Sequence, residues 1–210
     1  MRWDVGMGDG GGEWGAYSVV VLVVVAVVVA AVPLRRRSTW PFTLNTWEAV
    51  YFSHDEATLR RLADRAAAVG VERFVLDDGW FHERRDDTRG LGDWWVDPEV
   101  WPNGLDGLAG HVHALGMEFG LWFEPEMVNL DSDLAREHPD WILAAPEAVP
   151  YREDLSYRTQ YVLDLANPDA YAHVHAQMAD LVGRLHVDYI KWDHNRECDI
   201  TIHFMPLEFA

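Results

Sequence analysis

The sequence predicts an α/β protein, with about the first half of a (β/α)8 barrel over residues 40–197 and a Val-rich apolar segment before it. From Trp40 onward, short apolar segments alternate with amphipathic helical ones, which is the pattern of a parallel sheet with helical crossovers. Each main strand carries acidic residues at its C-terminal end, where a (β/α)8 barrel has its active site. A doubly wound open sheet would do the same, but no Gly-rich phosphate loop follows the first strand.

Four apolar segments are the expected parallel strands, which is about half of the eight in a complete barrel. They span residues 42–49, 73–81, 118–127 and 188–196, and a shorter strand is expected at 161–165. The acidic residues at the four strand ends are Glu48, Asp77 with Asp78, Glu124 with Glu126, and Asp193. Strand ends of a parallel sheet share one edge, so these side chains are expected to converge.

Helices are expected between the strands, over residues 55–69, 105–115 and 168–185. Asp55 can cap the first helix, and Gly70 can end it. Pro168 suits the first turn of the last helix. Two long polar stretches, 82–104 and 129–158, are expected to be loops, the second with a short helical piece near 131–138; long loops in compact domains tend to be functional.

The N-terminal part of the chain has a different character. Residues 1–17 are Gly-rich and are expected to be disordered. Residues 18–34 are mostly Val and Ala and precede three arginines, which allows three interpretations: a short membrane helix, a signal peptide, or a buried strand pair or artefact of a truncated or misread gene. The third is favoured, because the apolar run is short for a bilayer and the segment before it is acidic.

Composition limits the partners of the protein. Its formal net charge is −18, with 35 acidic and 17 basic residues, which argues against nucleic acid or an anionic membrane surface as partner. The single cysteine, Cys198, excludes an internal disulfide framework and stands in no reactive motif. Residues 198–210 show no helical period and are expected to be an irregular tail.

The last strand carries the most chemistry. Side chains alternate along a strand, so Lys191, Asp193 and Asn195 share one face, while Trp192 and His194 point to the other. A carboxylate beside a fixed cation stays ionised at neutral pH, as a nucleophile requires. The simpler interpretation is a salt-bridged strand end.

Carboxylates that converge beside Trp80, Trp122 and Trp192 suit either glycoside hydrolysis or a site for a hard metal ion. The ammonium of Lys191 favours hydrolysis, because it competes with a metal for the carboxylate of Asp193. Pairs of histidines two residues apart on predicted helices face different ways and are poor chelators: His111 with His113, and His173 with His175. No metal and no cofactor is therefore expected.

Four motifs, in order, resemble those of the α-galactosidases of glycoside hydrolase family 36. They are residues 76–81 (Leu-Asp-Asp-Gly-Trp-Phe), 120–129 (Gly-Leu-Trp-Phe-Glu-Pro-Glu-Met-Val-Asn), 158–165 (Arg-Thr-Gln-Tyr-Val-Leu-Asp-Leu) and 191–196 (Lys-Trp-Asp-His-Asn-Arg). Residues 45–49 resemble the first barrel strand of the family. The likeness runs from about Pro41 to Arg196.

The resemblance implies a retaining enzyme that removes terminal α-linked galactose from oligosaccharides such as raffinose or melibiose. Asp193 would be the nucleophile that forms the covalent glycosyl-enzyme. The residues that would bind the sugar are Asp77, Asp78, Trp122, Arg158, Lys191 and Asn195. Reasoning from the residues alone agrees on Lys191, Asp193 and Asn195, does not single out Arg158, and reads Trp122 equally well as a core aromatic.

The chain also departs from the family. No stretch of the 210 residues resembles the N-terminal β-sandwich of the family, and the acid/base aspartate of the family lies on a later strand, so the chain is expected to be a fragment with little activity of its own. Neighbouring specificities stay open: an α-N-acetylgalactosaminidase, or a galactosyl transferase of the raffinose-synthase type. A non-catalytic sugar-binding or membrane-tethered remnant is the alternative from another class.

The expected partner is a small carbohydrate, with a homo-oligomer implied by the family. The expected location is the cytoplasm, with a membrane anchor through residues 18–34 as the alternative.

Overall fold

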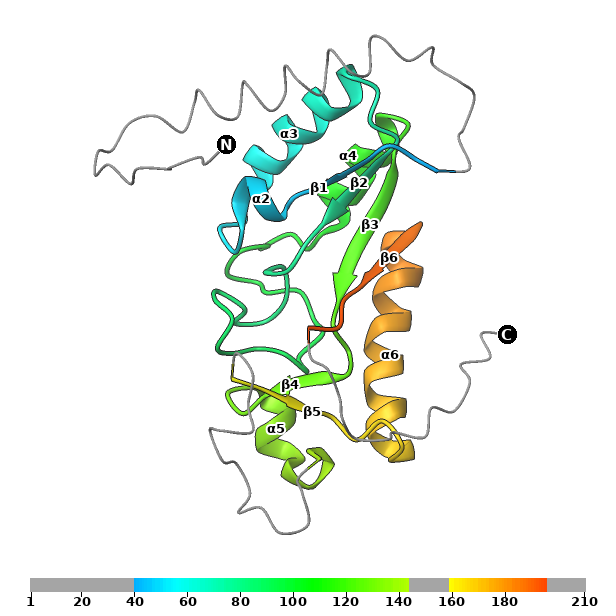
Figure 1. Ribbon diagram of the computed structural model, residues 1–210. Helices are drawn as coiled ribbons and strands as arrows, with labels where there is room; N and C mark the ends of the chain where they lie inside the picture. The colour runs from blue at the N-terminus through cyan, green and yellow to red at the C-terminus, as the bar shows by residue number, and fades with distance from the viewer. Residues whose placement is uncertain (1–39, 144–158, 196–210) are drawn as a thin grey trace, which may run out of the picture. The chain divides into compact units, whose positions relative to one another are not determined.

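The computed structural model describes residues 40–143 and 159–195 (Figure 1). They belong to one compact unit, residues 37–210. The expectations for residues 1–17, 18–34 and 198–210, and the one for Arg158, lie outside the described residues. Within the described residues, every helix is too short or too polar to cross a lipid bilayer.

A parallel four-stranded sheet forms the centre of the described part, which confirms the predicted α/β class. Its strands, in spatial order, are β1 (Thr43–Asn45), β2 (Arg73–Leu76), β3 (Glu118–Phe123) and β6 (Tyr189–Trp192). All three neighbouring pairs are parallel. The strands are shorter than predicted, because the polar residues at their C-terminal ends leave the hydrogen-bonded ladder.

The register brings residues from all four strands into one row. Asn45 lies beside Val75, Val75 beside Gly120, and Gly120 beside Tyr189. A Cβ atom on Gly120 would lie 2.9 Å from Cγ2 of Val75 and 3.2 Å from the Tyr189 ring. Gly120 therefore lets the two neighbouring side chains close over the central strand.

The helices begin and end where the sequence predicts. α3 (Glu56–Ala68) starts at Asp55, whose side chain accepts a hydrogen bond from the backbone N–H of Thr58. It is followed by Gly70 with φ +86°. α6 (Pro168–Leu185) starts at Asn167, whose side chain accepts from Asp169 N–H, and it has proline in its first turn.

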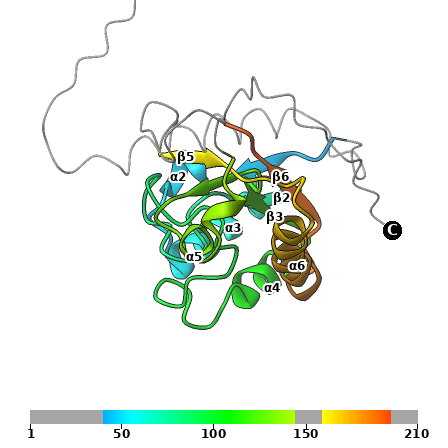
Figure 2. The same ribbon diagram turned by 90° about the horizontal axis from the view of Figure 1, so that it is seen from below.

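α4 (Asp106–Ala114) packs against β3 and contacts both α3 and α6. Figure 2 shows α4 and α6 on the same side of the sheet. The helices α3, α4 and α6 each bury apolar side chains, among them Leu59 of α3, Leu108 and Val112 of α4, and Leu181 of α6. The sheet and its helical layer therefore form one apolar core.

The predicted first strand, residues 42–49, is wrong in its second half, because Trp47–Val50 forms the short helix α2. The chain leaves the sheet at Thr46, which is fully buried and whose Oγ1 accepts a hydrogen bond from Asp77 N–H at 3.0 Å. Glu48 consequently lies exposed on α2, where it accepts a hydrogen bond from the Tyr51 hydroxyl. It does not join the acidic residues at the strand ends.

The predicted third strand, residues 118–127, is two strands. Proline has no N–H to donate, and the parallel pairing of β3 stops at Phe123, before Pro125. β4 (Met127–Asn129) then pairs antiparallel with β5 (Gln160–Val162) in a separate two-stranded sheet. The short strand expected at 161–165 thus belongs to this side layer, together with α5 (Asp133–Glu137) and the 3-10 turn η1 (Pro139–Trp141).

We expect Gly120→Ala to lower the free energy of unfolding by about 1–3 kcal/mol, because the new methyl group overlaps Val75 and Tyr189. Chemical denaturation followed by tryptophan fluorescence measures the change. The control is Gly110→Ala on α4, where nothing lies within 4 Å of the added Cβ and the helix should gain about 0.5–1 kcal/mol. Equal effects of the two substitutions would contradict the close approach at Gly120.

Candidate active site

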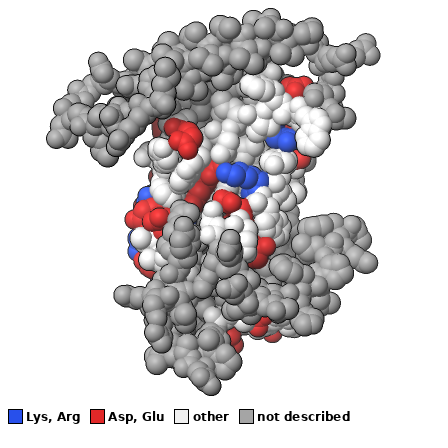
Figure 3. All heavy atoms as spheres, viewed as in Figure 1, with Lys and Arg blue, Asp and Glu red and all other residues white. Residues whose placement is uncertain are grey.

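Three side chains from neighbouring strands meet just beyond the row of Gly120. Trp122 of β3 lies beside Lys191 of β6 in the register, and Asp77 directly follows β2. The ammonium of Lys191 contacts Oδ2 of Asp77 at 2.6 Å, with Asp77 only 3% exposed. Oδ1 of Asp77 accepts a hydrogen bond from Asp78 N–H at 2.8 Å. Figure 3 shows basic and acidic atoms adjacent near the middle of this face of the molecule.

The carboxylate of Asp193 is held by three donors. Its Oδ2 accepts hydrogen bonds from the indole N–H of Trp122 and from Nδ2 of Asn195, both at 3.1 Å. Its Oδ1 accepts from His194 N–H at 3.1 Å. The residue is half-buried, so the carboxylate has a fixed orientation while part of it stays accessible.

Glu124 binds Asn195, one of the residues that hold Asp193, and its side chain is fully buried. Its Oε1 accepts hydrogen bonds from the backbone N–H of Asn195 at 2.9 Å and from Nδ2 of Asn195 at 3.0 Å. Burial raises the pKa of Glu124 above its ordinary value, and the negative charges of Asp193 and Asp78 raise the pKa further. Glu124 therefore fixes the chain after β6 at Asn195, and with it the amide that holds Asp193.

Asp78 is 4% exposed, and both of its carboxylate oxygens bind Arg84, a residue of the 82–104 loop. The guanidinium approaches in the two-pronged geometry typical of arginine and carboxylate, with NH2 at 2.9 Å and Nε at 3.0 Å. Sequence reasoning selected Asp78 and placed Glu124 among the acidic residues at the strand ends, but it missed Arg84 and Thr46. Nothing in the sequence marks these two, because their role depends on which segments the fold brings together.

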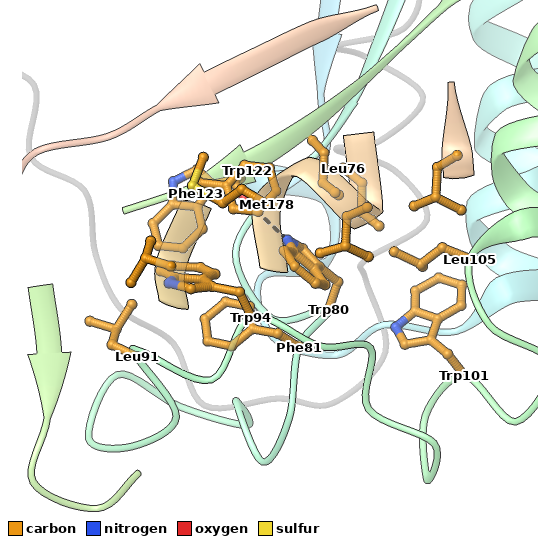
Figure 4. Close-up of a cluster of buried hydrophobic side chains, with 14 of the residues drawn as sticks. Leu76, Trp80, Phe81, Leu91, Trp94, Trp101, Leu105, Trp122, Phe123 and Met178 are labelled. Carbon is orange, nitrogen blue, oxygen red and sulfur yellow. Dashed lines mark hydrogen bonds between the residues drawn. The ribbon is translucent and has the colours of Figure 1, made fainter. Parts of the chain in front are cut away.

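The prediction that three tryptophans line the mouth of the site is wrong for two of them. Trp80 is fully buried, and its indole N–H donates to the backbone carbonyl of Trp122 at 3.0 Å (Figure 4). It packs edge-on against Phe81 and Phe123 in an aromatic cluster that also holds Trp94. This cluster joins the 82–104 loop to the core.

Trp192 is 41% exposed and donates its indole N–H to the carboxylate of Glu126, at 2.9 and 3.0 Å. It points away from Lys191 and Asp193, as strand alternation predicts. Trp122 is the tryptophan that reaches the site. Its side chain is 2% exposed, so it presents no open aromatic face. It contacts the site through its indole N–H, which donates to Asp193.

The structure thus brings together Asp77, Trp122, Lys191, Asp193 and Asn195 of the predicted site residues. Asp78 lies next to them with Arg84, and Arg158 is outside the described residues. Lys191 forms its ion pair with Asp77, whereas the sequence predicted that its ammonium lies beside Asp193. Over residues 40–143 and 159–195, no group of three or more His, Cys, Asp or Glu side chains is arranged to hold a metal ion.

A hollow of about 390 Å³ lies at the other end of the strands, lined by residues that include Glu72, His113, Glu118 and Asp188. Its carboxylates already have partners: Glu118 binds Arg73, and Asp188 binds His113. The hollow is separate from the carboxylates at the C-terminal ends of the strands. The chemistry is therefore assigned to the strand ends, where carboxylates, an ammonium and an amide present the donors and acceptors that suit a polyhydroxylated ligand.

Comparison with protein families gives a match over most of the chain. The family model described as Melibiase matches residues 27–204. An α-galactosidase of Escherichia coli is 52% identical over 157 residues, which cover 75% of this chain and 22% of the relative. The α-galactosidase AgaA of Geobacillus stearothermophilus is 47% identical over 156 residues, or 74% of this chain and 21% of the relative.

Solved structures agree with these relatives. An α-galactosidase of Lactobacillus brevis superposes with a TM-score of 0.71 at 46% identity, and covers 76% of this chain and 21% of that one. A variant of AgaA from Geobacillus stearothermophilus in complex with raffinose superposes with a TM-score of 0.71 at 43% identity, over 80% of this chain and 23% of that one. The chain spans about a fifth of the length of the curated relatives that it matches.

His54 makes the stability of the fold depend on pH. It is 9% exposed, lies against Gly79 and meets the ring of Trp101 edge-on. Burial, and after it the positive charge of Arg85, lower the pKa of His54 from 6.5 to about 4. The native state therefore holds this histidine neutral, and protonation favours the unfolded chain.

We expect the free energy of unfolding to fall by about 3 kcal/mol through His54 between pH 6.5 and pH 4, because the unfolded chain binds the proton first. In His54→Gln this contribution is absent, so the variant should lose less stability than the wild type over that window. Urea unfolding at several pH values measures the difference between the two proteins. A difference that stays constant with pH would show that His54 is not held neutral.

Proposed function

This chain belongs to the melibiase family, and from this membership we propose that the protein is an α-galactosidase that hydrolyses terminal α-linked galactose by a retaining mechanism. The single observation that supports this most is the carboxylate of Asp193. It is oriented by Trp122 and Asn195 at the same strand ends where Lys191 contacts Asp77. A fixed, accessible carboxylate among hydroxyl-binding groups is what nucleophilic attack on a sugar requires.

The parallel sheet is, in this proposal, the first half of a (β/α)8 barrel. β1 and β6 stand at the two edges of the described sheet, and each strand is followed by helical or loop structure. Active sites of such barrels lie at the C-terminal ends of the strands. Asp77, Glu124 and Asp193 all follow the last residue of a strand, in agreement with that rule.

Asp193 acts as the nucleophile. Its carboxylate oxygen forms a bond to the anomeric carbon of galactose while the bond to the leaving oxygen breaks, and the leaving oxygen takes up a proton. Water then attacks the glycosyl-enzyme, gives up a proton and releases galactose with its original anomeric configuration. Trp122 and Asn195 hold one oxygen of Asp193 so that the other can approach the sugar.

Asp77, Lys191 and Asn195 bind hydroxyl groups of the sugar, and Asp78 and Arg158 complete the set. Asp77 and Lys191 are already an ion pair, which leaves the remaining lone pairs of the carboxylate to accept from hydroxyls and the remaining N–H groups of the ammonium to donate. Such a paired site costs little reorganisation when the sugar binds. The proton donor to the leaving group is not assigned to a described residue.

α-Galactosyl fluoride tests this function in the 210-residue chain, because fluoride is a weakly basic leaving group that needs little proton donation. We expect fluoride release, with α-galactose as the first product in NMR spectra. Mass spectrometry of a quenched reaction should show one galactosyl group on the peptide that contains Asp193. Asp193→Asn should lose at least about 10³-fold in fluoride release, because the bond-forming oxygen is gone.

The matched control is Asp188→Asn, which changes an aspartate at the opposite end of the same strand and should keep both the rate and the label. β-Galactose as the first product would refute retention. A label on another residue would refute the role of Asp193. Faster reaction with α-N-acetylgalactosaminyl fluoride would change the assigned sugar.

A further inference from the structure

Arg84 is a fully buried arginine outside the residues that the proposed mechanism uses. It lies in the 82–104 loop and binds three segments at once. Nε and NH2 donate to Asp78, while NH1 donates to the backbone carbonyl of Arg89 at 2.8 Å and to Oδ1 of Asn129 at 3.1 Å. A buried ion pair contributes little net stability, because desolvation offsets the attraction between the charges. What this pair supplies is orientation of the carboxylate of Asp78.

Asn129 continues the connection into the side layer and is also fully buried. Its Oδ1 accepts from Arg84 and from Leu91 N–H at 3.0 Å. Its Nδ2 donates to the backbone carbonyl of Thr159 at 3.0 Å and to Oγ1 of Thr159 at 3.3 Å. Both ends of this amide are therefore in use, and its position depends on Arg84 and Thr159 together.

Thr159 has φ +58°, in the left-handed region that a β-branched residue rarely adopts. Such a conformation persists only where its surroundings hold it. Here Asn129 holds its carbonyl and hydroxyl, and the hydroxyl also donates to the backbone carbonyl of Asp87 at 3.3 Å. The strained residue opens β5, and all of its described contacts lead back to the 82–104 loop and to Asn129.

We propose that Arg84 and Asn129 are positioning residues that hold the carboxylate of Asp78 and the left-handed turn at Thr159 as one unit. A sugar bound at Asp78 then stabilises the turn and the start of β5, and by reciprocity the turn strengthens sugar binding. The chain of contacts runs from Asp78 through Arg84 and Asn129 to Thr159. Each link is a hydrogen bond; the first two join buried groups, and the last leads to the exposed Thr159. The inference rests on the proposed function in one respect only, namely that Asp78 binds the sugar.

Two variants separate the links. Arg84→Lys keeps the charge but loses the two-pronged contact with Asp78 and the bonds to Arg89 and Asn129. Asn129→Asp keeps an oxygen for Arg84 but replaces the amide N–H groups that hold Thr159. The matched control is Arg89→Gln, on the same loop, which removes a half-exposed pair with Asp131 and leaves the backbone carbonyl that Arg84 uses.

Galactose binding to the 210-residue chain, measured by calorimetry, should weaken about 10-fold or more in Arg84→Lys and stay unchanged in Arg89→Gln. In an Asp78→Asn background, Arg84→Lys should add little further loss, because the arginine acts through that carboxylate. Losses that simply add would assign Arg84 a general structural role and overturn the proposal.

Hydrogen exchange tests the coupling itself. Galactose should slow exchange of the β5 amides in the wild type, and this protection should disappear in Asn129→Asp and Arg84→Lys but persist in Arg89→Gln. If the wild-type chain does not bind galactose, the proposed function fails. Hydrogen exchange measured without sugar then tests whether Arg84 and Asn129 hold the turn at Thr159. Exchange at Leu91 and along β5 must be faster in Arg84→Lys than in Arg89→Gln, and equal rates would refute it.

Discussion

The ion pair between Lys191 and Asp77 is the contact on which the site depends. Its 2.6 Å separation joins the ends of β2 and β6 across the central strand β3. Gly120 of β3, two residues earlier in the register than Lys191, carries no side chain, and Val75 and Tyr189 lie close to it. The same register places Trp122 beside Lys191, from where its indole N–H reaches Asp193. One register therefore determines the positions of the ion pair and of the oriented carboxylate together.

Four acidic side chains share this small region, and each has its own compensation. Lys191 neutralises Asp77, Arg84 neutralises Asp78, and Asn195 with Trp122 binds Asp193. Glu124 is the member without a cation among its described hydrogen-bond partners, and its pKa is raised by burial and by its acidic neighbours. Three of the four carboxylates are thus buried beside compensating groups, and Asp193 is the half-buried one, which agrees with the role of nucleophile proposed for it.

The 82–104 loop is part of the folded core as well as of the site. Trp80 and Trp94 join it to the aromatic cluster beneath β3, and Arg84 ties it to Asp78 and Asn129. The sequence shows this stretch only as polar and rich in turn residues, which predicts a loop. Trp80, which stands just before this loop, was expected beside the converging carboxylates, yet it is fully buried. Whether such an aromatic side chain is buried depends on which segments pack over it in the folded chain, and no local sequence pattern predicts that.

The sequence by itself determined the α/β class, the helices that start at Asp55 and Pro168, and the shared face of Lys191, Asp193 and Asn195, because caps and strand alternation act over a few neighbouring residues. It also determined the family, through motifs that stand in order along the chain. Tertiary structure alone decided that Thr46 ends the first strand, that Lys191 pairs with Asp77, and that Arg84 and Glu124 support the site. The physical reason is that most of these contacts join residues about 30 to 114 positions apart in the sequence, so they form only once the strands are in register. Arg84 lies in a loop without a periodic hydrophobic pattern, so its burial is likewise decided by the fold.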